Sequence, residues 1–262
     1  MPASDETPLL PVPTRGRVHV VERRVELGDA SPGGRLRLDG LARVLQDVSN
    51  DDTRDVARSR AAAVDGDETS PAVWVIRRTL VQVERFGTYG ELLRCVTFCS
   101  GTGRAWAERR VSITGDRGAA IEALTLWVHL DPVSGRPSPL PDSFHATYGE
   151  AAAGRTVRAR LHLPDPPPDA PSEVWPLRFA DFDVMDHLNN ASYWVVVEEH
   201  LAHRRDLRAP LRAAVEFRSA VEHRHDVGVV SSDEPDALAM WLVGGQGVFA
   251  AARVERLAQP IS

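Results

Sequence analysis

The chain has 262 residues, of which 43% are hydrophobic and 26% are charged, which suits a soluble protein with one large or two small cores. A formal net charge of −6 argues against a general nucleic-acid binder. No apolar run approaches the roughly 18 residues of a membrane span, and the first 13 residues lack a signal-peptide core. We therefore expect a cytoplasmic protein with no membrane span.

The first part of the chain predicts one strand and one long helix. Residues 1–15 are expected to be a disordered lead, and residues 18–27 have the pattern of a strand. A helix is predicted over residues 39–57, with Asp39 as its N-cap. Its apolar stripe consists of Leu41, Val44, Leu45 and Val48. The polar residues 58–71 are then expected to form an exposed loop.

Four further strands are predicted over residues 73–86, 92–100, 106–114 and 119–130, with turns between them. The only cysteines, Cys95 and Cys99, are four residues apart in one of these strands. That spacing places them about 13 Å apart, beyond the reach of a disulfide bond, so we expect packed apolar thiols. The sequence has neither a zinc-type Cys/His spacing nor a Gly-rich phosphate loop, so no metal or cofactor is predicted.

A proline-rich segment, residues 136–172, divides the chain into two halves. Such a density of proline keeps a segment extended and outside a sheet, so we interpret it as a linker. Within it, residues 156–163 are compatible either with a short strand or with an irregular crossing segment.

The second half repeats the order of elements in the first, although its residues do not repeat. A strand is predicted over residues 174–182 and a helix over residues 190–203. The strands that follow are predicted at 213–219, 226–231, 238–242 and 248–257.

Between the strand and helix of the second half lies a dense polar cluster. It consists of Asp181, Asp183, Asp186, His187, Asn189 and Asn190. Loops that open a helix are common sites of chemistry, because the backbone N–H groups there are unpaired and the helix dipole favours negative charge. Taken singly, each of these residues is equally typical of a helix cap or a turn, and either asparagine can cap the helix.

The cluster contains the string Asp-x-Asp-x-x-x-His-x-Asn-Asn-x-x-Tyr, which runs from Asp181 to Tyr193. This string resembles the loop before the central helix in hotdog-fold acyl-acyl carrier protein (acyl-ACP) thioesterases of the bacterial type. The resemblance implies an α+β double hotdog, with two antiparallel sheets that each wrap round a central helix and are joined edge to edge. It also implies an acyl-pocket unit over residues 16–135 and a catalytic unit over residues 173–262.

The resemblance assigns roles to the polar cluster. Asp183 is expected to be the nucleophile or general base, and His187 to orient, donate a proton or activate water. Asp181, Asn189 and Asn190 are expected to support the loop or the oxyanion. Tyr193 and Trp194 have the spacing of core residues. The equivalent loop of the first half, residues 28–34, has no histidine and no paired aspartates, so one active site per chain is expected.

Two departures from the family pattern are visible. The family usually has an asparagine two residues after the second aspartate, where this chain has Met185. The family's catalytic glutamate falls at Ala220 or Val221 here. Glu222 is the nearest candidate for the missing carboxylate, and His223, His225 and Asp226 are close in sequence. The alternative interpretation of this group is a solvated turn at the end of a strand.

The sequence thus predicts a thioester hydrolase that releases free fatty acid from acyl-ACP in fatty acid biosynthesis. The alternatives are an acyl-CoA thioesterase and a catalytically inactive acyl-binding hotdog protein. Acyl carrier protein is the predicted partner, and the substrate-binding residues and the association of two chains as a homodimer are left open. Candidate residues for docking the acidic carrier are Arg77, Arg78, Arg204, Arg205, Arg208 and Arg212.

Overall fold

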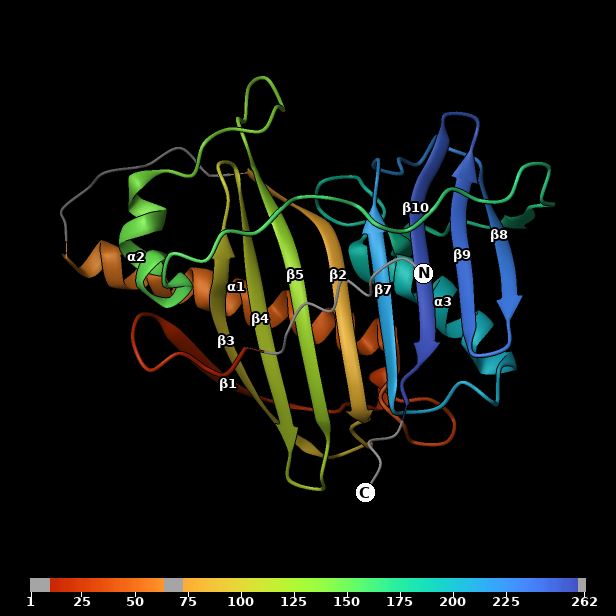
Figure 1. The fold of residues 1–262 in the computed structure, drawn as a ribbon, viewed down its shortest axis with the longest axis horizontal. Coiled ribbons are helices and arrows are strands. Elements are labelled where there is room, and N and C mark those ends of the chain that lie inside the picture. Colours follow the sequence, from red (N-terminus) through yellow and green to blue (C-terminus); the bar gives the residue numbers. More distant parts are fainter. Residues whose placement is uncertain (1–9, 64–72, 259–262) are drawn as a thin grey trace.

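The computed structural model describes residues 10–63 and 73–258, and its strands form one continuous antiparallel sheet (Figure 1). Across the sheet the strand order is β1-β3-β4-β5-β2-β7-β10-β9-β8-β6. The strands are β1 (Val18–Arg24), β2 (Val73–Arg85), β3 (Leu92–Thr102), β4 (Trp106–Gly115), β5 (Ala120–Leu130), β6 (Glu173–Trp175), β7 (Leu211–Phe217), β8 (Val227–Glu234), β9 (Ala237–Gly244) and β10 (Gly247–Arg256). The helices are α1 (Leu38–Ala63), α2 (Asp142–Ala152) and α3 (Asn190–His203), with short 3-10 helices η1 (Leu27–Asp29) and η2 (Phe179–Asp181).

The two predicted sheets are joined edge to edge, as expected, because β2 of the first half pairs directly with β7 of the second. Their register runs from Arg78 opposite Glu216 to Val83 opposite Leu211. Unpaired edge strands leave rows of backbone N–H and C=O groups without partners. Joining the two halves along these edges satisfies those groups, so two five-stranded halves become one ten-stranded sheet.

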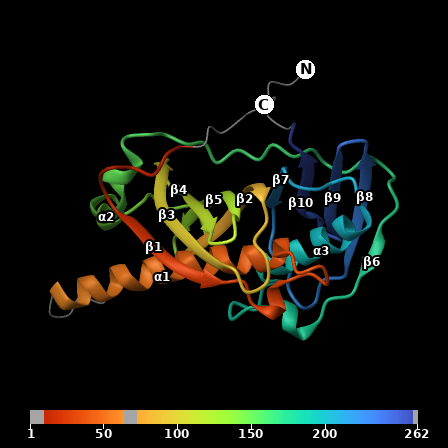
Figure 2. The ribbon, with the colours of Figure 1, turned by 90° about the horizontal axis from the view of Figure 1, so that it is seen from below.

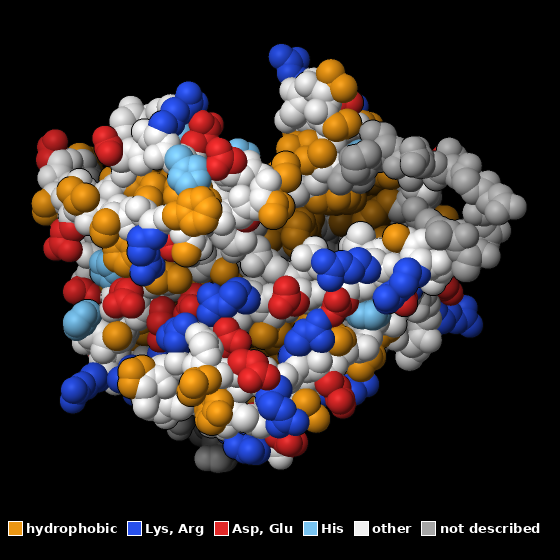
Figure 3. Space-filling model, turned by 180° about the vertical axis from the view of Figure 1, so that it is seen from behind, with side chains coloured by type: hydrophobic (Ala, Val, Ile, Leu, Met, Phe, Trp, Pro, Cys, Tyr) orange, Lys and Arg blue, Asp and Glu red, His pale blue; other side chains and the backbone are white. Residues whose placement is uncertain are grey.

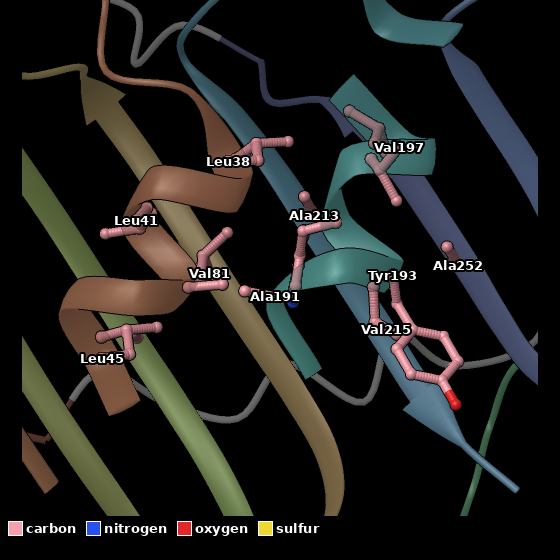
Figure 4. Packing of buried hydrophobic residues seen from close by; sticks show 14 of the residues in the cluster. Leu38, Leu41, Leu45, Val81, Ala191, Tyr193, Val197, Ala213, Val215 and Ala252 are labelled. Carbon is pink, nitrogen blue, oxygen red and sulfur yellow. The ribbon is translucent and has the colours of Figure 1, made fainter. Parts of the chain in front are cut away.

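Helices α1 and α3 lie on one face of the sheet, and the linker crosses the other face (Figure 2). Leu41 and Leu45 of α1, Tyr193 of α3, Val81 of β2 and Val215 of β7 belong to one hydrophobic core that spans both halves (Figure 4). Burial of such side chains contributes roughly 1.5–3 kcal/mol each. The two halves are therefore fused through a shared core as well as through the sheet.

The helix predictions are confirmed, with adjustments at the ends. Helix α3 has the predicted bounds, while α1 extends to Ala63 through residues predicted to be loop. Asp39 is not the N-cap but lies in the first turn of α1, where its carboxylate pairs with Arg37 and Arg43. The remainder of that predicted loop and most of the predicted disordered lead lie outside the described residues.

The linker is less extended than predicted, because it contains α2. This helix begins after Pro141 and ends at Ala153, which adopts a positive φ of 49°. Proline is tolerated at a helix start, where its missing N–H group costs nothing. Residues 156–163 cross the sheet as an irregular segment, anchored where the His162 and Leu163 N–H groups donate to the buried Glu216 carboxylate. Of the two options for this segment, the crossing is the one that forms.

The strand predicted over residues 174–182 is largely wrong, since only Glu173–Trp175 pairs with β8. Pro176 follows at once and has no N–H group to donate to a ladder. The chain then forms η2, so the polar cluster is approached through a tight helical turn.

Cys95 and Cys99 are buried and free, as predicted. Burial raises the pKa of each thiol to about 11, so both remain protonated and behave as apolar groups. Among the described residues, no helix is long and apolar enough to cross a membrane.

Candidate active site

The second-unit loop, residues 179–190, connects η2 to α3 and is held mainly by backbone hydrogen bonds. The Asp181 carbonyl accepts the Asn189 N–H group at 2.8 Å and the Ser192 hydroxyl at 3.0 Å. The buried Asp181 carboxylate accepts the Arg178 N–H group at 2.8 Å. Asp181 therefore fixes both ends of η2 relative to the start of α3.

Asp183 lies in a tight turn within this loop. Its N–H group donates to the His187 carbonyl at 2.9 Å, and its carboxylate accepts the Met185 N–H group, also at 2.9 Å. The Asp186 N–H group donates to the Asp183 carbonyl, and Asp186 has a φ of +60°. The carboxylate is partly buried and keeps acceptor positions beyond the one that Met185 uses.

The phenol of Tyr193 lies close enough to Asp183 for the carboxylate charge to affect the pKa of the phenol. Burial raises the pKa of Tyr193, and the Asp183 carboxylate raises it further. The ring is packed edge-on against Phe217, with centroids 5.1 Å apart. Tyr193 and Trp194 are both buried in the shared core, as their spacing predicts.

His187 is exposed and forms an isolated antiparallel bridge with Glu222, supported by a 2.8 Å bond from the Leu188 N–H group to the Val221 carbonyl. Side chains at bridged positions are cross-strand neighbours, with Cβ atoms about 4.5–5.5 Å apart. Glu222 also pairs with the exposed Arg224 at 2.9 Å. The structure therefore places the Glu222 side chain beside His187. Of the two positions at which the family's glutamate is expected, Ala220 is exposed and Val221 is buried, and neither has a carboxylate.

The other residues near Glu222 take different positions. His223 Nε2 lies 2.9 Å from a carboxylate oxygen of Asp186, and its ring stacks on Phe182 with centroids 3.5 Å apart. His225 accepts the Glu222 N–H group through Nδ1 at 2.9 Å, which stabilises the turn. Met185 is 62% exposed and directs no polar group into the site. The Asp186–His223 pair ties the tip of the second-unit loop to the turn after β7.

The two asparagines have separate positions. Asn189 is the N-cap of α3, since its side-chain oxygen accepts the Ala191 N–H group at 2.8 Å. Asn190 is the first residue of the helix and lines a narrow cavity between α1, α3 and the sheet. Within the described part of the chain, the Asn190 N–H group has no hydrogen-bond partner. A free N–H group at a helix N-terminus can stabilise a negatively charged oxygen.

The first-unit loop, residues 27–38, has the same backbone path as the second-unit loop. Its N–H groups of Ser31, Gly34 and Arg37 donate to the carbonyls of Arg35, Ser31 and Asp29. These bonds correspond one for one to those of Asp183, Asp186 and Asn189. Gly34 has a φ of +79° at the position of Asp186. The element-order repeat predicted from the sequence is thus a repeat of hydrogen bonds.

The side chains at equivalent positions differ in chemistry. Ser31 replaces Asp183, and Arg35 replaces His187. Arg35 forms an ion pair with Glu198 of α3, which is 6% exposed. The Glu198 carboxylate also accepts the N–H group of Leu38, the first residue of α1, at 3.0 Å. In the first unit, an internal carboxylate therefore occupies the helix N-terminus that is free in the second.

Two cavities lie on the helix-bearing side of the sheet. The larger, about 420 Å³, lies between α1, α2 and the sheet. Its mainly apolar walls include Val56, Trp74, Ala107, Trp127, Phe144 and Tyr148. Figure 3 shows a hollow lined with hydrophobic side chains on this side of the molecule. The narrow cavity at Asn190 is also lined by Trp127, so this indole separates the helix N-terminus from the larger cavity.

The arginines suggested for carrier docking are mostly engaged or remote. Arg204 pairs with Asp206 and Asp233 at the C-terminal end of α3. That end lies roughly 20 Å from the site, at 1.5 Å per residue along the helix. Arg77 lies closer, because it donates to the Phe217 and Arg218 carbonyls at the end of β7. Among the described residues, no group of His, Cys, Asp and Glu side chains could hold a metal ion.

Sequence reasoning alone missed Arg35, Gln46, Trp127 and Glu198. Gln46 and Trp127 line the narrow cavity, while Arg35 and Glu198 close the equivalent place in the first unit. The sequence does contain one signal that these two residues occupy equivalent places: Gln46 and Glu198 each lie eight residues after the first residue of their helix. Its meaning depends on how α1 and α3 pack, which the sequence pattern does not specify.

Comparisons with known proteins agree with this geometry. The family described as Acyl-ACP thioesterase N-terminal domain matches residues 16–148, and Acyl-ACP thioesterase C-terminal domain matches residues 168–242. An uncharacterised protein of Mycobacterium tuberculosis is 30% identical over 248 residues, which cover 94% of each chain. An oleoyl-acyl carrier protein thioesterase of Coriandrum sativum is 22% identical, over 82% of this chain and 63% of its own.

Solved structures with the same fold include the 12:0-ACP thioesterase from Umbellularia californica. Its TM-score is 0.72 at 20% identity, over 92% of this chain and 97% of its own. The putative oleoyl thioesterase from Lactobacillus plantarum has a TM-score of 0.71 at 17% identity, over 96% and 100% of the two chains. At these identities the likeness establishes the architecture alone.

Proposed function

This chain belongs to the acyl-ACP thioesterase family, and from that premise we propose that it releases free fatty acid from acyl-ACP during fatty acid biosynthesis in the cytoplasm. The observation that carries the proposal is the contrast between its two helix N-termini. Beside the free N–H group of Asn190 lies a loop with Asp183 and His187. The first unit has the same backbone but fills that place with Glu198.

In the proposed reaction, Asp183 acts as general base. Its carboxylate removes a proton from a water molecule, whose oxygen attacks the thioester carbonyl carbon. The carbonyl oxygen becomes negatively charged and is stabilised by the Asn190 N–H group at the helix N-terminus. When the tetrahedral intermediate collapses, the carbon–sulfur bond breaks and the thiolate leaves. Direct attack by Asp183 through an acyl-enzyme anhydride is the other route, and single-turnover hydrolysis in ¹⁸O-labelled water distinguishes the two by labelling Asp183.

His187 is proposed to protonate or orient the departing thiolate, with Glu222 as its neighbouring carboxylate. The bridge between His187 and Glu222 supports this pairing, because it makes the two side chains cross-strand neighbours. Glu222 thereby takes the part of the glutamate that is missing at Ala220 or Val221. We propose that Asp181 and Asn189 support the site indirectly, by fixing the loop and capping the helix.

The acyl chain is proposed to enter the cavity of about 420 Å³ in the first unit, past Trp127. Apolar walls suit a hydrocarbon chain, since each buried methylene gains about 0.8 kcal/mol. The far wall carries Tyr148 and Arg109, and Arg109 pairs with the buried Asp52 at 2.7 Å. This fixed polar wall limits how long a chain the cavity can accept.

Acyl carrier protein is the proposed donor of the acyl group, on the strength of family membership. The position of Arg204 removes it from the docking surface, since it is neutralised by two carboxylates far from the site. Arg178 and Arg224 are more exposed and flank the second-unit loop, so they are the better candidates for steering an acidic carrier.

The proposal is tested by incubating the purified chain with acyl-ACP and acyl-CoA substrates of several chain lengths and measuring free fatty acid and free thiol. We expect hydrolysis of both, with a higher kcat/KM for acyl-ACP. A preference for acyl-CoA would favour the first alternative. Tight acyl binding without hydrolysis would favour the inactive acyl-binding protein, for which Met185 in place of the family's asparagine is the specific motive.

A further inference from the structure

Helices α1 and α3 pack against each other in opposite directions. Leu38, at the start of α1, contacts Glu198 near the end of α3, and Gln46 of α1 lines the narrow cavity with Asn190 at the start of α3. Between these two points, Ala42 and Trp194 line the same cavity. The two contacts are therefore related by the internal two-fold symmetry of the double hotdog.

Gln46 occupies in α1 the position that Glu198 occupies in α3. Both lie eight residues after the first residue of their helix, Leu38 and Asn190 respectively. Since Glu198 reaches the N–H group of Leu38, the symmetry directs Gln46 towards the N–H group of Asn190. The cavity that Gln46 and Asn190 both line is the independent observation that supports this placement.

The Gln46 side chain and the Asn190 N–H group have no other hydrogen-bond partner among the described residues. The partly buried Gln46 side chain makes no hydrogen bond there, and neither does the Asn190 N–H group. The buried indole N–H group of Trp127, in the same cavity, is also without a partner. Buried donors in folded proteins are normally paired, so unpaired donors round one small cavity indicate a place for an acceptor.

We propose that the side-chain amide of Gln46 is a second oxyanion donor, which binds the thioester oxygen together with the Asn190 N–H group. This inference deepens the proposed hydrolysis and rests on it. It makes the active site composite: the base and one donor come from the second unit, and the other donor comes from the helix of the first. The fusion of two hotdog units then has a chemical purpose as well as a structural one.

The identity of the residue at this position explains why only one half-site is open. Glu198 is a carboxylate, so it accepts the Leu38 N–H group itself and is held there by Arg35. Gln46 has a neutral amide, whose oxygen is a weaker acceptor than a carboxylate and makes no hydrogen bond among the described residues, and its two N–H donors can bind an anion. The changes from Arg35 to His187 and from Glu198 to Gln46 together leave the second helix N-terminus free for substrate.

The test compares Gln46→Leu and Gln46→Glu with the native chain, using acyl-ACP hydrolysis from pH 5 to 9. Asp47→Asn, at the next and exposed position of α1, is the matched control and is expected to keep native rates. Loss of one oxyanion donor lowers kcat by about 100- to 1,000-fold. We expect a loss of that order in Gln46→Leu, with a much smaller change in KM.

The pH dependence of activity in Gln46→Glu distinguishes a catalytic role of Gln46 from a structural one, because a structural role would leave that dependence unchanged. Its ionised carboxylate should imitate Glu198 and block the site at neutral pH. As the pH falls and the carboxyl group becomes protonated, it gains an O–H donor, so activity should rise relative to the native profile. Native kcat in Gln46→Leu, or a native pH profile in Gln46→Glu, would overturn the proposal.

Binding of dodecanoate by calorimetry tests the same site without turnover, because its carboxylate resembles the oxyanion. Gln46→Glu is nearly isosteric with the native residue, and circular dichroism verifies its fold. We expect it to bind dodecanoate at least about tenfold more weakly than the native chain at pH 8, since two like charges would meet. Equal affinity would contradict the role of Gln46. Absence of hydrolysis by the native chain would instead count against the proposed function.

Discussion

The first-unit and second-unit loops have the same backbone path, but the helix N-terminus after the first loop is occupied by Glu198 and the one after the second loop is free. Their hydrogen bonds correspond one for one, and Gly34 and Asp186 share a left-handed conformation. Only Asp29 with Asp181, and Leu36 with Leu188, are identical residues at equivalent positions. The shared aspartate and leucine maintain the path of the loop, while the remaining side chains decide whether the helix N-terminus is open.

The comparison teaches that a half-site can be closed without changing its fold. In the first unit, Arg35 and Glu198 form a plug, because the carboxylate accepts the N–H group that a substrate oxygen would need. In the second unit, His187 and Gln46 stand at the corresponding positions. Closing the first site also joins the two units, since the plug comes from the opposite helix.

The largest effect is expected from Asp183→Asn. The amide keeps an oxygen for the Met185 N–H group, so the turn should persist, but the base is lost. We expect kcat to fall by at least about 100-fold, in line with general-base contributions, with little change in Tm. Ser31→Asn, at the equivalent first-unit position, is the control and should leave kcat unchanged. Rates near native in Asp183→Asn would remove this residue from its role.

The next effect is a loss of stability when the Arg35–Glu198 plug is removed. Glu198→Gln removes the charge that holds Arg35 and caps α1. Hydrogen bonds to charged groups contribute about 1.5–3 kcal/mol, and we expect a loss of about 1–2 kcal/mol because Arg35 is partly exposed. Urea unfolding should show it, with the exposed neighbour variant Glu199→Gln as control. Equal stability of the two variants would mean that the plug does not join the units.

A change of acyl specificity is expected from Ala107→Leu, which narrows the large cavity of the first unit. Two methylenes of acyl chain correspond to about 1.6 kcal/mol of burial, or roughly a tenfold change in relative rates. The ratio of kcat/KM for long and short acyl-ACP substrates should therefore fall by about tenfold. Ala252→Leu, in the core of the second unit, is the control. The same profile in both variants would place the acyl pocket elsewhere.

A smaller effect is expected from Glu222→Gln, because a carboxylate whose side chain is 40% exposed influences its neighbour weakly through water. Loss of the charge beside His187 should lower kcat by up to about fivefold, the rate equivalent of the roughly 1 kcal/mol of an exposed pair, with little change in KM. Thr88→Ala, at the equivalent bridge of the first unit, should have no effect on rate. A native kcat in Glu222→Gln would leave the missing carboxylate without a replacement.

The smallest effect is expected from Met185→Asn, which restores the family's residue. Met185 is exposed, so the substitution should not disturb the core. We expect a rate at least equal to the native rate, measured with acyl-ACP under saturating conditions. A clear loss of activity would show that the loop has adapted to methionine.

The sequence by itself determined the helices, most strands, the burial of both cysteines and the position of the polar cluster. These follow from local periods and local chemistry: apolar stripes at helical spacing, turn residues, and a cap such as Asn189. The asymmetry between the loops was also readable, because it depends on which residues are present. Misassigned segments, such as residues 174–182, lie where proline and a 3-10 turn override a strand-like pattern.

The tertiary structure alone decided which strands form the seam between the two sheets and which residue of the opposite helix lies near each helix N-terminus. Neither property has a local signal. The β2–β7 seam depends on two strand edges that are 120 or more residues apart in the chain. The contacts of Glu198 and Gln46 depend on antiparallel packing of α1 and α3 over a shared core. The proposed active site, which lies between two units, becomes visible only once those units are placed together.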